Sequence, residues 1–279
     1  MRESLRRIYT LAKRNVKEIM RDPLSLIFTL GMPLAMEILF YFLFHGMTAQ
    51  FDMKYLAPGI VVFSQAFLSL FAGLLIAQDR SSAFLTRLYV SRARSHEFIF
   101  GYALSMLPLV AVQSVLFFVV GGIIDPSIWS VGVLWCVLLS LVTALFYVGM
   151  GILLGSLCTE KSIGGIASIV IAGQSLLSGM WFPPEGLNGA ILTIMRCLPF
   201  KNATDLMQRA LAGFTSASDF LVPFAVVIAY TVATICVAIY AFAKKMRAKK
   251  RKRIFSGKSF ALFLFLSLYS IMERNGGTI

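Results

Sequence analysis

Long apolar stretches take up most of this chain, and they decide the solvent in which it can fold. Six stretches each hold about 20 or more largely apolar residues, enough for a helix to cross about 30 Å of hydrocarbon. They are Leu24–His45, Leu56–Gln78, Phe98–Gly121, Val131–Gly155, Ile163–Phe182 and Asp219–Ala243. With 58% hydrophobic residues, too little polar surface remains to cover a soluble core. The sequence predicts an all-α membrane protein whose residues 23–243 form six transmembrane helices.

Basic residues are distributed unevenly among the loops. Twenty of the 26 lysines and arginines precede the first stretch, lie between the second and third or the fourth and fifth, or directly follow the sixth. The alternate loops hold four, which are Lys54, Arg196, Lys201 and Arg209. By the positive-inside rule, we expect a multi-pass protein of the plasma membrane with both termini in the cytoplasm. Because the basic residues flank apolar spans, membrane lipids are the expected partners, and nucleic acid is not.

Residues 1–22 are expected to form a separate helix in the cytoplasmic headgroup layer, ahead of the Asp22-Pro23 break. Apolar residues recur on one face at helical spacing, and most basic residues occupy the other. The apolar face comprises Leu5, Ile8, Tyr9, Ala12, Val16, Ile19 and Met20. The apolar stretch that follows is too long for a cleavable signal peptide. Two interpretations fit this helix: an anchor that only sets topology, or a lever that passes force into the first span.

No pattern of catalytic or metal-binding residues is present. The four cysteines and two histidines lie apart, without metal-ligand spacing. Gly257-Lys258-Ser259 resembles the end of a phosphate-binding loop, but Lys252 stands where that loop needs a glycine. We therefore expect no catalytic residues, no metal site and no cofactor bound by this chain. Residues 244–279 are interpreted as a basic cytoplasmic tail with a short apolar segment.

A few polar residues lie within the apolar stretches. Glu37, Gln65 and Gln174 are predicted to line a substrate path or a contact between subunits, since an intramembrane polar group should face protein or water. For Glu37, pairing with another span is an equally good interpretation. Gly151 and Gly155 are four residues apart, a spacing that lets helices approach closely, and packing within one subunit is favoured over dimerisation.

Two loops carry more sequence than a connection needs. The cytoplasmic loop Asp79–Glu97 holds an apolar stripe of Phe84, Leu85, Leu88 and Tyr89 among arginines, which is typical of a docking element. The outer loop, from Ser178 to about Ser218, contains two helix-like apolar segments. Because such segments are unlikely to stand free in water, we expect the outer loop to dip back into the outer leaflet as re-entrant half-helices.

These motifs, in this order, resemble the permease subunit of type-2 ATP-binding-cassette (ABC) exporters. Ser178-Gly179-Met180-Trp181-Phe182-Pro183 matches the Ser-Gly-x-x-x-Pro element that ends the fifth span of that family. Leu85-Thr86-Arg87-Leu88 matches its cytoplasmic Leu-x-Arg-Leu pattern, and Leu198-Pro199-Phe200 follows its outer half-helices. The resemblance covers residues 1–250. The chain departs from the family at Asp79-Arg80-Ser81-Ser82, which lacks the usual glycine, and at Ser91-Arg92, where Ser-Pro is common.

The resemblance implies a transport subunit, with ATP and Mg bound by separate ABC ATPase partners. The residues it assigns to ATPase coupling are Arg80, Phe84, Leu85, Arg87, Leu88, Tyr89 and Arg92. The residues it assigns to an outer gate are Ser178, Gly179, Trp181, Phe182, Pro183 and Pro199. It also implies a second permease, an identical copy or a homologue, packed mainly through the first and fifth spans.

The expected cargo is an amphipathic small molecule such as a drug, antibiotic, peptide or lipid, because the spans are apolar and aromatic and most outer loops are short. Export of a polysaccharide or a lipid-linked glycan is the alternative. An ion-coupled secondary transporter would need several ionisable groups deep in the membrane, and Glu37 alone lies there. A membrane-embedded enzyme would need clustered Asp, Glu or His residues, which the spans lack.

The predicted topology can be tested with a membrane-impermeant cysteine reagent on intact cells. Cysteines introduced at Asp125 or Asn188 should be labelled from outside, because these positions follow an odd number of spans. A cysteine introduced at Ser91 should be labelled only after the cells are opened. Labelling of Ser91 in intact cells would contradict six spans with cytoplasmic termini.

Overall fold

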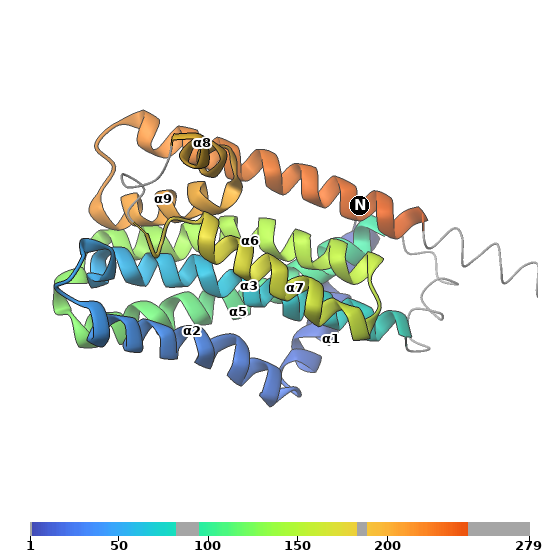
Figure 1. Cartoon of the computed structure of the whole chain (residues 1–279). Coiled ribbons are helices and arrows are strands. Elements are labelled where there is room, and N and C mark those ends of the chain that lie inside the picture. The colour runs from blue at the N-terminus through green and yellow to red at the C-terminus, as the bar shows by residue number, and fades with distance from the viewer. Residues whose placement is uncertain (1, 82–94, 183–188, 245–279) are drawn as a thin grey trace, which may run out of the picture.

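The computed structural model describes residues 2–81, 95–182 and 189–244, and this part of the chain is helical, without strands. Figure 1 shows long helices running side by side, with shorter helices at the two ends of the bundle. The helices are α1 (Arg2–Ile19), α2 (Pro23–Phe44), α3 (Met53–Ser81), α5 (Ser95–Ile124), α6 (Val131–Leu157), α7 (Glu160–Leu177), α8 (Gly189–Cys197), α9 (Pro199–Ala212) and a last helix, Ala217–Lys244. Two 3₁₀ turns, η1 (Ala49–Phe51) and η2 (Pro126–Ile128), join neighbouring helices. The predicted all-α fold is confirmed.

Five of the described helices are long and apolar enough to cross a membrane: α2, α3, α5, α6 and the last helix. They coincide closely with five of the six predicted stretches. The remaining stretch was expected to run to Phe182, but α7 ends at Leu177 because Gly179 adopts a φ of +72°, which a right-handed helix excludes. With 18 residues, α7 is about 27 Å long, slightly less than a hydrocarbon core. The count of six spans stays a prediction.

Helix α3 lies at the centre of the bundle. It packs against α2, α5, α6, α7 and α9. Of the 18 consecutive residues that form its most apolar part, 83% are buried inside the protein. The corresponding share is 17% for both α2 and the last helix, which therefore present most of their apolar side chains outward. An apolar surface of this size on the long helices is what lipid or another membrane subunit would cover.

Glycines allow α6 to lie directly on the backbone of α3. A Cβ added at Gly151 would lie 2.2 Å from the carbonyl oxygen of Ser69, and one added at Gly155 would lie 2.5 Å from that of Gly73. Both distances are shorter than any real contact, so only glycine fits. The prediction that this pair packs within one subunit is confirmed.

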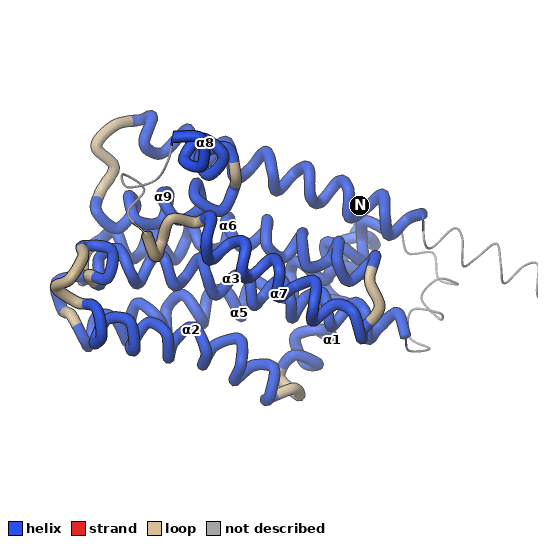
Figure 2. Tube along the Cα trace, viewed as in Figure 1, coloured by secondary structure: helices blue, strands red, loops and turns tan. Residues whose placement is uncertain are grey.

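Most connections between helices lie at the two ends of the bundle, whereas the loop after α7 and the α8–α9 loop lie partway along it, as Figure 2 shows. One end, called the α1 end below, holds α1, the α6–α7 turn and the end of the last helix (Figure 1). The other, called the α9 end, holds η1, η2, α8 and α9. Lys54 and Arg209 lie at the α9 end, and Arg196 and Lys201 flank the start of α9. Among the described residues, the basic side chains of α1, with Arg80, Lys161 and Lys244, lie at the α1 end, so the charge asymmetry of the sequence distinguishes the α1 end from the rest of the bundle.

Substituting Gly151 tests the α3–α6 contact. Gly151→Ala should lower stability by about 1–3 kcal/mol, the usual range for overpacking, because the two backbones must separate. Gly189→Ala on α8 is the matched control, since its Cβ would meet nothing within 4 Å. Thermal unfolding in detergent should show a large loss for Gly151→Ala and little change for Gly189→Ala. Equal effects would contradict the packing described.

Candidate functional site

Helix α1 is bound to the first turn of α5 by a charged contact. The guanidinium of Arg7 donates two hydrogen bonds to the carboxylate of Glu97, at 2.8 and 3.0 Å. The hydroxyl of Ser4 donates a third, at 2.6 Å, and Glu97 is only 3% exposed. The hydrogen bonds to Glu97 raise the pKa of Arg7, so this guanidinium stays charged. A cation from α1 and an anion from α5 thereby fix one end of α1 on the bundle.

A second charged contact joins α1 to the end of α3. Arg14 donates two hydrogen bonds to Asp79, at 2.6 and 2.8 Å, and the hydroxyl of Tyr102 on α5 donates another to Asp79 at 2.5 Å. Burial of the guanidinium lowers the pKa of Arg14, but the hydrogen bonds and charge of Asp79 outweigh it and the net shift is upward. Asp79 is 4% exposed, and Asn15 beside Arg14 is fully buried.

Arg80, one of the predicted coupling residues, binds the end of α6. Its Nη1 donates to the carbonyl oxygens of Gly155, Ser156 and Cys158, at 2.5, 2.6 and 3.1 Å. A cation in this position satisfies carbonyl groups that a helix C-terminus leaves without partners. The other predicted coupling residues, Phe84, Leu85, Arg87, Leu88, Tyr89 and Arg92, lie outside the described residues.

Together these contacts hold the end of α3 and the start of α5, which flank residues 82–94, on α1 and α6. Asp79 and Arg80 lie at the end of α3, Glu97 lies at the start of α5, and all three are bound to α1 or α6. The described ends of α3 and α5 are thus tied to each other through α1. The sequence placed these residues in one loop, but it could not show that Arg7 and Arg14 pair with them, since their partners lie 90 and 65 residues away.

The polar residues predicted within the spans are buried between helices of this one chain. Gln174 on α7 donates to the carbonyl oxygen of Val62 at 2.8 Å, and Gln65 on α3 donates to that of Ser140 at 3.1 Å. Such hydrogen bonds hold helices together where lipid offers no competing water. Both glutamines are fully buried, so in this conformation neither faces a substrate or a second subunit. A role in the path stays a prediction.

Glu37 is also fully buried, on the side of α2 that faces α5. A Cβ added at Gly121 of α5 would lie 3.1 Å from its Oε1. Neither carboxyl oxygen has a hydrogen-bond partner within the described part of the chain. The interpretation that Glu37 pairs with another span is therefore not supported by this structure, and its role in a path or subunit contact stays a prediction.

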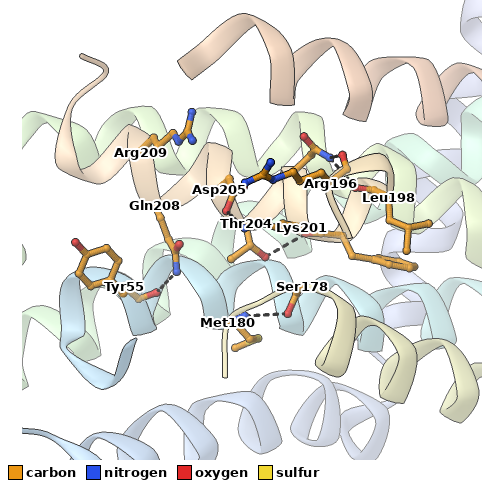
Figure 3. Close-up of polar contacts among 12 residues, drawn as sticks. Tyr55, Ser178, Met180, Arg196, Leu198, Lys201, Thr204, Asp205, Gln208 and Arg209 are labelled. Carbon is orange, nitrogen blue, oxygen red and sulfur yellow. Dashed lines mark hydrogen bonds and ion pairs between the residues drawn. The ribbon is translucent and has the colours of Figure 1, made fainter. Parts of the chain in front are cut away.

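The predicted gate residues lie at the α9 end, directly after α7. Ser178 is buried and its Oγ accepts a hydrogen bond from the backbone N–H of Met180 at 3.3 Å, within the turn made at Gly179. Met180 packs on Gly59 of α3, where an added Cβ would lie 3.3 Å from the Met180 Cβ. Figure 3 shows this turn beneath α9. Pro183 lies outside the described residues.

Trp181 joins α7 to α2 and α3. Its indole N–H donates to Ser175 at 2.7 Å, and its ring lies edge-on to Phe40, with 4.5 Å between ring centroids. Phe51 and Phe63 complete the aromatic cluster, with centroids 6.5 and 5.8 Å from that of Trp181. Phe182, next along the chain, is exposed instead. Residues from four elements thus meet at the end of α7.

Helix α9 begins about halfway along α6 and ends beside the first turn of α6. Phe200, one residue after the buried Pro199, lies 5.9 Å from Phe146 between ring centroids. At the other end, a Cβ added at Gly132 would lie 2.6 Å from the carbonyl oxygen of Leu211. Gln208 also donates to the carbonyl oxygen of Tyr55 on α3 (Figure 3). α9 therefore runs within the bundle and does not lie across its end.

The sequence matches a known family. The family model described as ABC-2 type transporter matches residues 6–212, from the second turn of α1 to the last residue of α9. The chain belongs to the ABC-2 type transporter family. No curated protein matches the chain.

Membership of the ABC-2 family makes this chain the membrane component of an ABC transporter. It is a multi-pass permease and not itself the ATPase, and it works with ABC ATPase subunits. Within the described residues, no group of three or more His, Cys, Asp or Glu side chains is placed to hold a metal ion. The contacts of α1 and the turn at Gly179 are therefore interpreted as parts of a transporter.

The contact between Arg14 and Asp79 can be measured by a double-mutant cycle. We expect Arg14→Ala and Asp79→Ala to be coupled by about 1–3 kcal/mol, since each leaves a partly or fully buried charge without its partner. Thermal unfolding of the single and double variants gives the coupling. The exposed pair Arg209–Asp219 at the α9 end is the control and should show coupling within error. A coupling free energy no larger than that of the control would contradict a strong contact between Arg14 and Asp79.

Proposed function

We propose that this permease belongs to an exporter that moves amphipathic small molecules, such as drugs, antibiotics, peptides or lipids, out of the cytoplasm. Multidrug efflux is one such activity. The observation that carries the proposal is the joint fixing of α1 and both ends of the segment 82–94 at one end of the bundle. An ATPase bound to that segment would act on three helices at once. The α1 end is then the cytoplasmic end, in agreement with the excess of basic residues there.

The movement driven by ATP hydrolysis would be transmitted to the transmembrane helices through α1. Its exposed apolar residues, including Leu5, Tyr9 and Met20, lie along one strip that the headgroup layer would cover, while Arg7 and Arg14 hold its other side to α5 and α3. Because α1 leads into α2 through Asp22, a displacement of α1 would shift α2 along the bundle. This supports the interpretation of residues 1–22 as a lever.

Two copies of the chain, or this chain and a homologue, would form the transporter. Helices α2 and α7 both pack on α3 and leave an outward face that the described residues do not cover. On α7 that face carries Gly165, Ser168 and Ile169, and an added Cβ at Gly165 would meet nothing within 4 Å. Small residues allow close approach of a second helix. The family resemblance implies a second permease packed mainly through the first and fifth spans. These spans correspond to α2 and α7, whose outward faces would form that contact.

The α9 end would hold the outer gate and set the character of the cargo. Trp181, Phe40 and Phe51 form an aromatic cluster where α7 meets α2, and α8 and α9 would reach into the outer leaflet as a re-entrant pair. Aromatic side chains bind apolar and amphipathic molecules through large contact areas. An apolar gate of this kind favours an amphipathic cargo over an ion.

Replacing the apolar stripe of the segment 82–94 tests the coupling to an ATPase. Burial of two large side chains is worth about 3 kcal/mol or more, over a hundredfold in affinity. The double variant Leu85→Asp/Leu88→Asp should therefore lose co-purification of the ATPase subunit while still inserting in the membrane. The control is Met47→Asp/Thr48→Asp, which adds the same two charges at exposed positions of the turn after α2 at the opposite end and should keep the ATPase bound.

Retained co-purification and retained substrate-stimulated ATP hydrolysis in Leu85→Asp/Leu88→Asp would refute docking on this segment. Loss in both double variants would point to a general folding defect, and size-exclusion profiles of the two would show it. Transport of candidate amphipathic compounds into inverted vesicles, compared with an ATPase-deficient complex, tests the direction and the cargo class.

A further inference from the structure

A basic cavity lies between α1 and α3 at the α1 end, and none of the roles described above uses it. Its volume is about 590 Å³, and it is open to the outside. Four cationic side chains line it, Lys13, Arg14, Lys17 and Arg21. Lys13, Lys17 and Arg21 are spaced four residues apart, so they lie on one side of α1 and of the turn that follows it. The cavity is large enough to hold a phosphate group with its surroundings.

The carboxylates of the cavity already have partners, whereas three of the cations do not. Asp22 accepts hydrogen bonds from the backbone N–H and the hydroxyl of Ser25 as the N-cap of α2. Glu18 is paired with Arg14, which also binds Asp79. The side chains of Lys13, Lys17 and Arg21 have no hydrogen-bond or ion-pair partner among the described residues. With four cations against the carboxylates of Glu18 and Asp22, the lining of the cavity carries net positive charge.

The cavity continues into an apolar crevice. A smaller cavity of about 40 Å³ shares Glu18, Asp22 and Gln78 with it and is lined further by Ile19, Phe71 and Leu75. Immediately beyond Asp22, the side chains of Leu24, Ile27 and Phe28 on α2 are exposed and apolar. The boundary between the headgroup layer and the hydrocarbon thus passes through this point. A free phosphate would use only the basic part, whereas a lipid would use both.

We propose that this cavity is a binding site for an anionic membrane lipid, whose phosphate lies among Lys13, Lys17 and Arg21 and whose acyl chain begins in the crevice beside Phe71 and Leu75. The bound lipid contacts α1, the start of α2 and the last turns of α3 together. It therefore holds α1 in the position in which Arg14 reaches Asp79. Anionic lipid becomes a structural part of the lever, independently of the cargo and of the ATPase docking segment.

Lipid binding to the purified full-length chain in a neutral detergent tests the proposal. Native mass spectrometry and thermal stabilisation are measured against phosphatidylglycerol, phosphatidylcholine and inorganic phosphate. The test variant is Lys13→Gln/Lys17→Gln, which leaves the Arg7–Glu97 and Arg14–Asp79 contacts intact. The control is Arg6→Gln/Lys161→Gln, which removes the same charge from the same end but outside the cavity. Each basic side chain near an anionic headgroup is worth about fivefold in affinity, so the test variant should bind phosphatidylglycerol about 25-fold more weakly.

The wild-type chain and the control variant should retain phosphatidylglycerol and be stabilised by it, with phosphatidylcholine having little effect. Equal affinity of the test variant and the control would overturn the proposal. Displacement of the lipid by millimolar inorganic phosphate would identify a free phosphate site and overturn the lipid assignment. A test variant that keeps its lipid affinity but loses its ATPase partner would make the cavity a protein-docking surface. If the double variant does not fold, Lys17→Gln alone should still weaken binding about fivefold.

Discussion

The backbone contact between α3 and α6 is the constraint on which the rest of the bundle depends. In a bilayer, helices gain little by hiding apolar side chains from lipid, so close packing must hold them together. Gly151 and Gly155 bring α6 onto the carbonyl groups of Ser69 and Gly73, and α2, α5, α7 and α9 then pack around α3. With α3 so enclosed, the side-chain N–H of Gln65 donates to a carbonyl oxygen of α6 inside the protein.

The charged contacts at the α1 end are made by residues that are held in place by this packed centre. Asp79 and Arg80 lie on the last turns of α3, where α3 leaves the packed core, and Glu97 lies on the first turn of α5. The carboxylates of Asp79 and Glu97 are nearly buried and bind the guanidinium groups of Arg14 and Arg7. Lys13 and Lys17 on the same helix have no partner among the described residues. In the two proposals above, this one short helix serves both the ATPase side and the lipid side of the transporter.

Several features of the site were predictable from local sequence and others were not. The family resemblance placed the end of the fifth span at the element Ser178–Pro183, and the structure makes the turn at Gly179, although the apolar stretch was predicted to continue to Phe182. The amphipathic pattern of residues 1–22 predicted α1 but assigned its whole apolar face to lipid. In the structure Ala12 and Ile19 are buried against the bundle, while Leu5 and Tyr9 are exposed. Periodicity locates a face on a helix but does not name what covers it.

The sequence by itself determined the membrane class, five of the helices, the asymmetry between the two ends and the family resemblance. These depend on hydrophobicity, charge and short motifs, which act over one or two helical turns or can be summed along the chain. Only the tertiary structure decided that Gln65 and Gln174 bind other helices of the same chain, that Glu37 faces Gly121 without a partner, and that Arg7 and Arg14 clamp both ends of the segment 82–94. Each of these is a contact between residues far apart in the chain, and the packing of α3 with its neighbours sets which side chains can meet.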